Sequence, residues 1–548
     1  MEILNIKNLS FKYPNSENNS LTDINLTVNE GEFVVVFGES GSGKTTLLRL
    51  LKKEIAPYGE KQGDIKFKNK NIEKLTQLES AKNIGFVMQN PKSQIVTNKV
   101  SFELAFGLEN IGEELNSIRR KVAETADFFG ISNLFNKDTS TISGGQTQLL
   151  NLASIMAMQP NILLLDEPLS QLDPISSKEL ITVLKRLNEE LSITIVIVEH
   201  RLEELLPIAD KAVYIKDGKI KAVASPKEVC KEISSKEEYS KMLKALPVGV
   251  QIYNKFKIDT TCPMSVKQTR KYIKENFKNV IQELNSNSSV ENKKNIIDNV
   301  IEVRNVFFRY EKKSRDILTD VTLDIKKEEV LSILGANGSG KTTLLKLLCK
   351  DNKPYSGKIK VDSKTKILLL PQNPIDLLVK DSVIEDLEFA CENYNSEKNS
   401  IENICKKLGV EHTINKNPMD LSGGEQQKVA IAKLLIAKPD VLLMDEPTKG
   451  MDAYARETLV NIIKDIKKQG VTVIVVTHDT DFCAKVSDRC LMLFNGEVVA
   501  IDSVNKFFSD NIFYQTSVGK ITKNIYKNIN NIDSLEKICK INGRLKEV

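Results

Sequence analysis

Apolar residues follow two spacings along this chain, and both spacings occur twice. In "EILNIKNLSFK", near the start, and in "VIEVRNVFF", from Val300, apolar and polar residues alternate. A short apolar run follows each time, at 33–37 and, with Ser332 as its one polar residue, at 330–334. Alternation predicts strands with one buried face, and an unbroken apolar run predicts a strand buried on both faces. Each half of the chain therefore begins with the same succession of predicted strands.

Further apolar runs lie later in each half. They read "NILLLDEP" and "ITIVIVEH" in the first half, then "VLLMDEP" and "VTVIVVTH" in the second. Segments such as "TTLLRLLKK" predict helices between them, so we expect an α/β fold with mostly parallel strands covered on both faces. The predicted domains are 1–243 and 299–530. Repeats of this length are duplicated domains rather than a solenoid.

The stretch 244–298 between the predicted domains has weaker periodicity. It contains a predicted helix, "SVKQTRKYIKENFKNVIQEL", and then the polar run "NSNSSVENKKN", which is typical of a flexible linker. Residues 531–548 are predicted to form a C-terminal tail with some helix.

Composition narrows the class of protein. A chain of 548 residues is too long to fold around a single hydrophobic core, so two or more domains are expected. Its 41% hydrophobic and 28% charged residues are ordinary for a globular protein. A balance of 78 basic against 73 acidic residues does not predict nucleic-acid binding. No apolar run reaches 18 residues, so we expect no transmembrane span. The eight cysteines form no C-x-x-C pair, which argues against zinc or disulfide frameworks and fits a reducing cytosol.

Each half contains the pattern G-x-x-x-x-G-K-[ST] between an apolar run and a predicted helix. Its glycines let backbone N–H groups turn toward phosphate oxygens, and the helix adds the positive end of its dipole. The lysine is expected to reach the β- and γ-phosphates of ATP, and the threonine to place a hydroxyl on Mg²⁺. The predicted phosphate-loop residues are Gly38, Glu39, Ser40, Gly41, Ser42, Gly43, Lys44, Thr45 and Thr46, and Gly335, Ala336, Asn337, Gly338, Ser339, Gly340, Lys341, Thr342 and Thr343.

An apolar run ends in an acid pair in each half. In "LLLDEP" and "LLMDEP" the predicted strand points Asp166 and Asp445 at the metal. The adjacent Glu167 and Glu446 can polarise an attacking water. An acid pair by itself is more often a helix cap, but here it accompanies the phosphate loop in the same order in both halves. We therefore interpret both glutamates as catalytic.

A Ser-Gly-Gly sequence precedes a predicted helix in each half. It exposes backbone donors and a hydroxyl at a helix N-terminus, which makes a second anion site. If the halves stack head to tail, each motif can close over the γ-phosphate held by the other half, which gives two composite ATP sites. The predicted residues are Ser143, Gly144, Gly145 and Gln146, and Ser422, Gly423, Gly424 and Glu425.

With these motifs in this order, the chain resembles two ABC-type nucleotide-binding domains fused in tandem. The resemblance covers nearly the whole chain except the linker and tail. It implies two P-loop NTPase domains, each with a mostly parallel core sheet, an antiparallel β subdomain and a helical signature subdomain. It also implies that segments 170–173 (SQLD) and 449–452 (KGMD) link opposite sites.

The same resemblance implies three further roles. Tyr13 and Tyr310 are expected to stack on adenine. Gln89 and Gln372 are expected to sense Mg²⁺ in glutamine loops that also contact a membrane partner. His200 and His478 are expected to be switch histidines that contact the γ-phosphate. His412 matches no motif, and we expect it to be solvated.

Several stretches resemble the ATPases of energy-coupling-factor (ECF) importers of cobalt and vitamins. They are "QNPKSQIVTNKVSFELAFGLEN", "VEHRLEELLPIADKAVYIKDGKI", "DEPTKGMDA" and "CPMSVKQTRKYIKEN". This resemblance implies ATP hydrolysis, with Mg²⁺, coupled to import of a vitamin, a vitamin precursor or a transition-metal ion. It implies two partners, an energy-coupling transmembrane protein and a small substrate-binding membrane protein. The chain is then expected at the cytoplasmic face of the cell membrane.

Two alternatives remain open. One is a soluble, ribosome-associated ATPase of the ABC-F type, in which the acid pairs are typically found in the sequence "DEPTNHLD". The sequences of this chain, "DEPLSQLD" and "DEPTKGMD", do not fit that pattern. A fused sugar-importer ATPase usually has one degraded site, whereas both acid pairs are intact here.

The first half departs from the family pattern after its signature. The second half keeps "QQKVAIAK", but the first reads "TQLLNLAS", with Leu149 and Ser154 at the basic positions. The site that pairs Glu446 with Ser143 is therefore expected to work less well. We expect Glu167→Gln to lower turnover more than Glu446→Gln.

Overall fold

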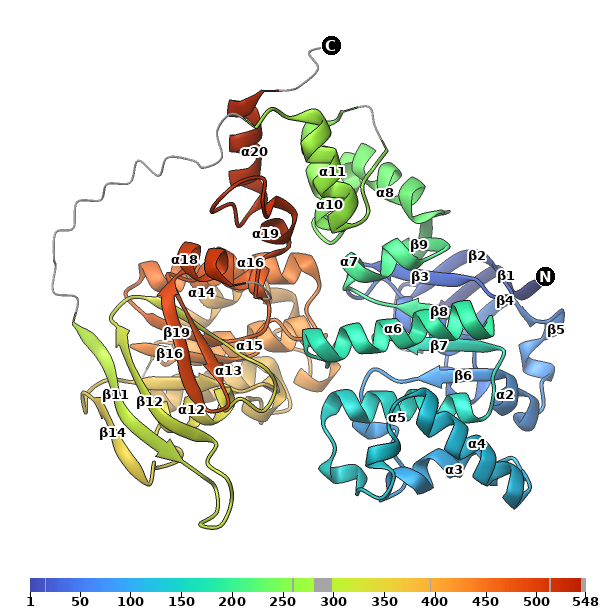
Figure 1. Ribbon diagram of the computed structural model, residues 1–548, viewed down its shortest axis with the longest axis horizontal. Coiled ribbons are helices and arrows are strands. Elements are labelled where there is room, and N and C mark those ends of the chain that lie inside the picture. Colours follow the sequence, from blue (N-terminus) through green and yellow to red (C-terminus); the bar gives the residue numbers. More distant parts are fainter. Residues whose placement is uncertain (15, 259–260, 280–297, 395, 512–513, 544–548) are drawn as a thin grey trace. The chain divides into compact units, whose positions relative to one another are not determined.

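The computed structural model describes residues 1–14, 16–258, 261–279, 298–394, 396–511 and 514–543 (Figure 1). The chain divides into two compact units, Met1–Ser265 and Val266–Val548. Residues 244–265 of the predicted linker belong to the first unit. The polar run 285–295 lies outside the described residues.

The central sheet of the first unit has the strand order β10-β9-β3-β8-β7-β6. Neighbouring strands from β6 to β9 run parallel, whereas β10 runs antiparallel to β9. The bounds are β3 (Phe33–Gly38), β6 (Ile84–Val87), β7 (Ile162–Asp166), β8 (Thr194–Val198), β9 (Lys211–Lys216) and β10 (Lys219–Ala224).

Strand β3 is buried on both faces, as its unbroken apolar run predicts. Phe33, Val35 and Phe37 pack into one core, and Val34 and Val36 pack into another. Successive side chains of a strand point to opposite faces, so a strand covered on both sides has apolar residues at nearly every position. This burial holds the end of β3 in place, and the phosphate loop begins there.

A separate antiparallel sheet of the first unit has the order β2-β1-β4-β5. Its strands are β1 (Glu2–Lys12), β2 (Leu21–Asn29), β4 (Glu60–Phe67) and β5 (Lys70–Asn71). Alternate residues of β1 and β2, such as Ile6, Leu26 and Val28, are buried in the core shared with β3.

The helices of the first unit include a separate group, α3 to α5, in which α5 packs beside the edge strand β6 (Figure 1). This group is the helical subdomain and carries the Ser-Gly-Gly sequence at the start of α5. The helix bounds are α1 (Lys44–Leu50), α2 (Gln77–Asn83), α3 (Val100–Asn110), α4 (Leu115–Phe128), α5 (Gly144–Ala157), α6 (Pro174–Leu191), α7 (Leu202–Leu205), α8 (Pro226–Ser235), α9 (Ser240–Leu243) and α10 (Val248–Phe256).

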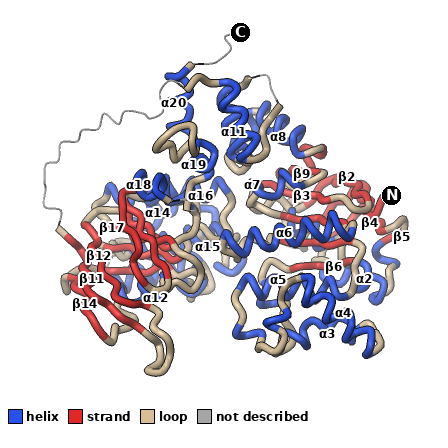
Figure 2. The backbone as a smooth tube through the Cα atoms, viewed as in Figure 1, coloured by secondary structure: helices blue, strands red, loops and turns tan. Residues whose placement is uncertain are grey.

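The second unit repeats the same architecture. Its central sheet has the order β15-β16-β17-β13-β18-β19, with β19 antiparallel to β18. The strands β11, β12 and β14 lie side by side in a separate antiparallel sheet (Figure 2). The bounds are β11 (Asn299–Phe308), β12 (Leu318–Lys326), β13 (Val330–Leu334), β14 (Ser356–Val361), β15 (Ile367–Leu370), β16 (Val441–Asp445), β17 (Thr472–Val476), β18 (Arg489–Phe494) and β19 (Glu497–Ser503).

The helices of the second unit include α13 to α15, which pack on one another as α3 to α5 do. The helix bounds are α11 (Val266–Asn276), α12 (Lys341–Leu348), α13 (Val383–Tyr394), α14 (Asn399–Leu408), α15 (Gly423–Ile436), α16 (Ala453–Lys468), α17 (Thr480–Val486), α18 (Val504–Asp510), α19 (Ser517–Thr522) and α20 (Ile532–Asn542).

The predicted linker helix is shorter than its sequence pattern. Helix α11 ends at Asn276, and residues 280–284 of the prediction lie outside the described residues. Arg270 on α11 donates to the backbone oxygens of Lys520 and Ile521 at the end of α19, so α11 packs against the C-terminal helices of the second unit.

The predicted fold class is confirmed. Each unit has a mostly parallel core sheet, an antiparallel β subdomain and a helical subdomain, which is a tandem P-loop NTPase architecture. Within the part of the chain that the structure describes, no helix combines the length and apolar character needed to cross a membrane.

Candidate functional site

The phosphate loop of the first unit joins β3 to α1. Gly43 has φ 93°, a left-handed conformation that favours glycine, and Lys44 begins the helix. At Gly38 an added Cβ would lie 2.0 Å from the backbone oxygen of Ile215 and 2.9 Å from Oγ of Ser42. Side chains are therefore excluded where the backbone must turn tightly.

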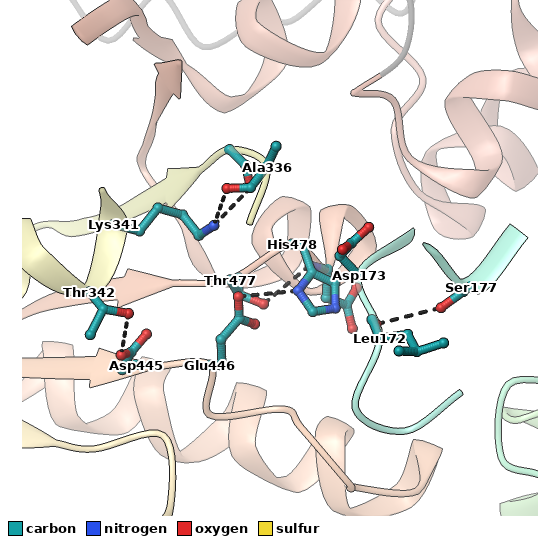
Figure 3. Close-up of polar contacts among 12 residues, drawn as sticks. Leu172, Asp173, Ser177, Ala336, Lys341, Thr342, Asp445, Glu446, Thr477 and His478 are labelled. Atoms are coloured by element: carbon teal, nitrogen blue, oxygen red, sulfur yellow. Dashed lines mark hydrogen bonds and ion pairs between the residues drawn. The ribbon is translucent and has the colours of Figure 1, made fainter. Parts of the chain in front are cut away.

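The loop lysine lies back against its own loop in both units. Lys44 Nζ donates to the backbone oxygens of Gly38 (3.1 Å) and Glu39 (2.7 Å). Lys341 Nζ makes the equivalent bonds, to Gly335 and to Ala336, at 2.9 Å each; Figure 3 draws the bond to Ala336. The ammonium group is thus held at the loop, where it can contact a phosphate oxygen.

The loops also contain buried hydroxyls that match a phosphate. Ser42 Oγ and Ser339 Oγ are buried, and neither has a hydrogen-bond partner among the described residues. A buried hydroxyl without a partner costs free energy unless a ligand satisfies it. Together with the lysines, these donors fit a nucleotide phosphate.

A threonine–aspartate pair follows each loop. Thr45 Oγ1 donates to Asp166 Oδ1 at 2.9 Å, and Thr342 Oγ1 donates to Asp445 Oδ2 at 2.7 Å (Figure 3). Burial raises the pKa of Asp166 to about 6, and the adjacent Glu167 acts in the same direction. Burial also raises the pKa of Asp445, so both buried carboxylates are poorly compensated.

These oxygens fit Mg²⁺. Asp445 Oδ1 is buried without a partner among the described residues. No group of three or more His, Cys, Asp and Glu side chains within the described ranges is arranged to hold a metal. Mg²⁺ commonly uses one or two carboxylates together with substrate phosphates, so a threonine and an aspartate beside a phosphate loop suit it.

The second acid of each pair is held in an unusual backbone conformation. Glu167 has φ 44° and Glu446 has φ 49°, a region that non-glycine residues rarely occupy. Their N–H groups donate to the backbone oxygens of Val198 and Val476 at the ends of the neighbouring strands β8 and β17. Strain of this kind persists where the surrounding structure imposes it, and it gathers at functional sites.

Each of these glutamates contacts a histidine. His200 Nε2 lies 3.1 Å from Glu167 Oε1, and His478 Nδ1 lies 3.1 Å from Glu446 Oε1 (Figure 3). Burial by itself would raise the pKa of Glu167, but the His200 ring and the Lys44 ammonium outweigh it, and the pKa lies below its ordinary value. An ionised carboxylate suits a group that accepts a proton from water.

The glutamine loops differ between the units. Gln89 Nε2 donates to Glu167 Oε2 at 2.8 Å, which adds a fourth predicted group to the first cluster. Gln372 is exposed and makes no hydrogen bond to any described residue. The structure thus brings Gln89 to the acid pair of its unit but leaves Gln372 apart from its own.

The predicted adenine-stacking tyrosines are tied to the loops. Tyr13 OH lies 3.1 Å from Thr46 Oγ1, and Tyr310 OH lies 3.2 Å from Thr343 Oγ1. Tyr310 is 55% exposed, so its ring can receive a base. Both rings therefore stand beside the helix that follows the phosphate loop.

The signature serines lie at helix N-termini, as predicted. Ser143 is the N-cap of α5 and forms a capping box with Gln146, and Ser422 is the N-cap of α15 and forms one with Glu425. Both serines are exposed, and neither makes a hydrogen bond to the described phosphate-loop residues of its own unit. Within each unit the signature is therefore separate from the loop–acid–histidine cluster.

The sequence profile described as ABC transporter matches residues 21–170 and again 318–449. The chain belongs to the ABC transporter family. Family membership implies ATP binding and hydrolysis, typically with Mg²⁺. Each match contains a phosphate loop and an acid pair, whereas His200 and His478 lie beyond the matched residues.

Comparison with known ABC proteins extends over most of the chain. A "Putative ABC transporter ATP-binding protein" of Bacillus thuringiensis subsp. konkukian is 39% identical over 531 residues, covering 94% of this chain and 95% of the relative. A solved archaeal ribosome recycling factor, aABCE1 in complex with the ribosomal stalk protein aP1, shares the fold at TM-score 0.59 and 22% identity, covering 91% and 90%. The structure of cbiO1 from Clostridium perfringens, part of the ABC transporter complex cbiONQ, covers 44% of this chain and 94% of its own at 29% identity and TM-score 0.39.

Three contacts of this ABC protein escaped the sequence analysis. Glu199, directly before the switch histidine, is buried against the cluster of the first unit. His412, expected to be solvated, is exposed but also lies 2.7 Å from the signature residue Glu425. Lys433 reaches the buried Asp386 on another helix. The only sequence signal was that Glu199 and Lys433 stand where the other half has an uncharged residue.

Proposed function

We propose that this ABC protein is the ATP-hydrolysing subunit of an ECF-type importer of a micronutrient. The observation that carries the ATPase part is the cluster repeated in each unit, in which a loop lysine, a threonine–aspartate pair and a strained glutamate–histidine pair lie together. The import part rests on the ECF resemblance of four sequence stretches.

We assign the same roles in both units. The phosphate loop and its lysine neutralise the β- and γ-phosphates, and Tyr13 and Tyr310 stack on adenine. Mg²⁺, held beside Thr45 and Asp166 and their counterparts Thr342 and Asp445, supplies charge neutralisation for phosphoryl transfer.

The glutamate–histidine pair does the proton chemistry in this proposal. Glu167 and Glu446 accept a proton from the attacking water, because an ionised carboxylate can orient and polarise it. His200 and His478 hold the glutamate and contact the γ-phosphate. Gln89 and Gln372 link the nucleotide to the membrane partner.

The signature serines complete the proposed sites. Because Ser143 and Ser422 stand apart from the cluster of their own unit, we propose that each ATP is shared between the two halves, with each signature closing on the other half's γ-phosphate. Loss of the γ-phosphate contacts then lets the halves separate, and this motion drives the partner.

Exposed apolar side chains near the first glutamine loop supply a surface for a membrane partner. Met88 (37% exposed) precedes Gln89, and Val96 (65%), Phe102 (56%) and Phe106 (38%) follow it. Exposed apolar groups gathered in one region mark interaction sites. In the second unit Val379 and Phe389 are exposed at the matching positions, whereas Glu385 replaces the counterpart of Phe102.

A pull-down from native membranes tests the import proposal. The tagged chain is extracted in gentle detergent, and the proteins recovered with it are identified by mass spectrometry. We expect one larger multi-span protein and one small membrane protein, and the small one would indicate the solute. Recovery with ribosomes and without membrane proteins would overturn the ECF assignment in favour of the soluble ABC-F alternative. A lone pair of sugar-permease subunits would indicate the sugar-importer alternative.

A matched pair of variants sharpens this test. Phe102→Asp places a charge in the proposed docking surface, and we expect it to lower recovery of the membrane proteins. Leu191→Asp changes an apolar side chain of similar exposure, 51%, at the end of α6, and recovery should stay at the wild-type level. Equal recovery with both variants would contradict this docking surface.

A further inference from the structure

The first unit contains a buried acid for which the proposed mechanism has no role. Glu199 is 1% exposed and directly precedes His200. The corresponding residue of the second unit is Thr477, directly before His478. A fully buried carboxyl group is costly unless hydrogen bonds or charges compensate it, so its surroundings indicate its role.

Three backbone N–H groups converge on the Glu199 carboxylate. Leu169 N donates to Oε1 at 2.6 Å, and His200 N and Arg201 N donate to Oε2 at 2.9 and 3.3 Å. Leu169 belongs to the segment between Glu167 and the SQLD sequence. One side chain therefore joins the segment after the acid pair to the segment that carries the switch histidine.

Arg201 makes a second link between the same two segments. Its Nη1 donates to the backbone oxygen of Leu172 at 3.3 Å and to Ser177 Oγ at 3.0 Å. Leu172 lies in the SQLD sequence, and Ser177 lies on α6. The histidine segment is thus bonded to both ends of the stretch 169–172, through Glu199 at Leu169 and through Arg201 at Leu172.

In the second unit the arginine of this connection lies on the helix α16 instead of in the histidine segment. Arg456 on α16, at the position of Ser177, donates from Nε to the backbone oxygen of Met451 at 3.2 Å and from Nη1 to Asp479 Oδ2 at 3.4 Å. Asp479 stands where the first unit has Arg201. Both units place a guanidinium on the matching backbone oxygen, but a threonine, Thr477, replaces the bridging carboxylate.

The form of Glu199 that fits its donors is the carboxylate. Burial raises the pKa of Glu199, and the charge of Glu167 acts in the same direction. A carboxylate oxygen accepts a hydrogen bond from an N–H group more strongly than the hydroxyl oxygen of a protonated carboxyl group does. The three N–H donors therefore favour the ionised form and oppose the rise in pKa. Replacement by threonine would leave the Leu169 N–H without this acceptor, because the shorter side chain lacks the second carboxylate oxygen.

We propose that Glu199 is a positioning residue of the first ATP site, which locks the segment after Glu167 to the segment carrying His200 and so sets the Glu167–His200 contact. The inference rests on the proposed roles of Glu167 and His200 and is independent of import. It predicts that loss of Glu199 disturbs hydrolysis more than nucleotide binding, because the phosphate loop does not contact Glu199 in the hydrogen bonds described.

The test compares Glu199→Thr and Glu199→Gln with wild type in the full-length chain. Amide hydrogen exchange of Leu169 should accelerate about tenfold in Glu199→Thr, since a charged acceptor is lost. The KM for ATP should change less than about threefold, while kcat falls by at least half of the loss that Glu167→Gln causes. Glu199→Gln, which keeps one acceptor oxygen, should fall between wild type and Glu199→Thr in both measurements.

A rescue variant separates positioning from simple destabilisation. The triple variant Glu199→Thr, Arg201→Asp and Ser177→Arg gives the first unit the arrangement of the second, and it should restore kcat to within about threefold of wild type. Glu103→Gln is the matched control, because Glu103 is 4% exposed and accepts the N–H groups of Val96 and Thr97 in the same unit. It should leave Leu169 exchange and kcat unchanged even if it lowers Tm.

The outcomes distinguish this inference from the proposed function. If Glu167→Gln abolishes most hydrolysis but Glu199→Thr changes neither exchange nor kcat, the positioning role is wrong and the catalytic assignment stands. If Glu167→Gln leaves hydrolysis intact, the catalytic assignment fails, and the positioning role fails with it. If the control accelerates Leu169 exchange as much as Glu199→Thr does, the effect is global and the inference is overturned.

Discussion

In the first unit a carboxylate, Glu199, ties the histidine segment to its neighbour, whereas in the second unit Thr477 stands there and Arg456 makes the connection from α16. The proposed hydrolytic pairs keep the same separation, with both histidines 3.1 Å from their glutamates, although His200 makes the contact through Nε2 and His478 through Nδ1. A glutamate–histidine contact of the same length is thus held by different supporting residues, since the support needs only to fix two segments together.

The signature helices give a second comparison. In the second unit Lys433 on α15 donates to the backbone oxygen of Leu377 at 2.6 Å, just after the glutamine loop. In the first unit Ser154 stands at that position, but Asn151 on α5 donates to the backbone oxygen of Pro91 at 2.8 Å. The missing basic residue is thus partly compensated by a neutral one, without the charge that pairs with Asp386.

The largest expected difference between the units concerns the catalytic glutamates. Glu167→Gln should lower ATP turnover about tenfold or more, because it removes the proton acceptor of the stronger site. Glu446→Gln should lower it only about twofold, because its site is expected to use the altered first signature. Phosphate release by the purified complex measures both, and equal losses or the reverse order would sink the assignment of a weaker site.

A stability difference should distinguish the two signature helices. Lys433→Ala leaves Asp386, which is fully buried, with only backbone donors, and should destabilise the second unit by about 3 kcal/mol. Asn151→Ala removes a neutral hydrogen bond and should cost about 1 kcal/mol.

Thermal unfolding of the full chain measures this difference as shifts in Tm. Lys468→Ala is the control, because the Lys468–Asp465 pair is largely exposed and should contribute little. Similar shifts in Tm for Lys433→Ala and Asn151→Ala would show that the charge of Lys433 adds no stability beyond that of a neutral hydrogen bond.

The smallest expected effect is a difference in pH dependence between two matching acids. Glu32 accepts from Lys211 and Glu329 from Arg489. For Glu32, burial raises the pKa but hydrogen bonds from Asn29 and Lys211 outweigh it, so the pKa is lowered. For Glu329, burial dominates the donors and the pKa is raised.

The signs of these shifts give opposite trends in stability. A lowered pKa contributes stability above the ordinary value of 4.5 that is lost as pH falls through the lower value of the folded state. A raised pKa contributes stability at lower pH that is lost as pH rises through the higher value of the folded state. From pH 4 to pH 7, the Tm of Glu32→Gln should therefore fall relative to wild type, and that of Glu329→Gln should rise. Parallel trends for the two variants would contradict the difference in burial.

Sequence reasoning reached most of the fold because local patterns encode it. The apolar run at 33–37 and the run at 330–334, which is apolar except for Ser332, predict the central strands β3 and β13, since a strand covered on both faces is apolar at nearly every position. The phosphate loop could also be predicted, because Lys44, Thr45 and the glycines beside them belong to one contiguous segment. The helix predicted over 265–284 was placed less well, as its described part ends at Asn276.

Tertiary structure decided which side chains support the site. Glu199 and Leu169 are 30 residues apart, and only the pairing of β7 with β8 brings them to the same sheet edge. The exchange of Arg201 and Ser177 for Asp479 and Arg456 is equally invisible along the chain, because the two positions of each pair are more than 20 residues apart and meet only in the folded unit.

The amino-acid sequence by itself determined the duplicated α/β architecture and the residues around each phosphate loop, because these depend on periodicity and short spacings. The folded chain decided that Glu167 and Glu446 adopt positive φ, that Gln89 reaches its acid pair while Gln372 does not, and that Glu32 and Glu329 shift in opposite directions. Those properties follow from burial and from contacts between distant segments, which no local pattern specifies.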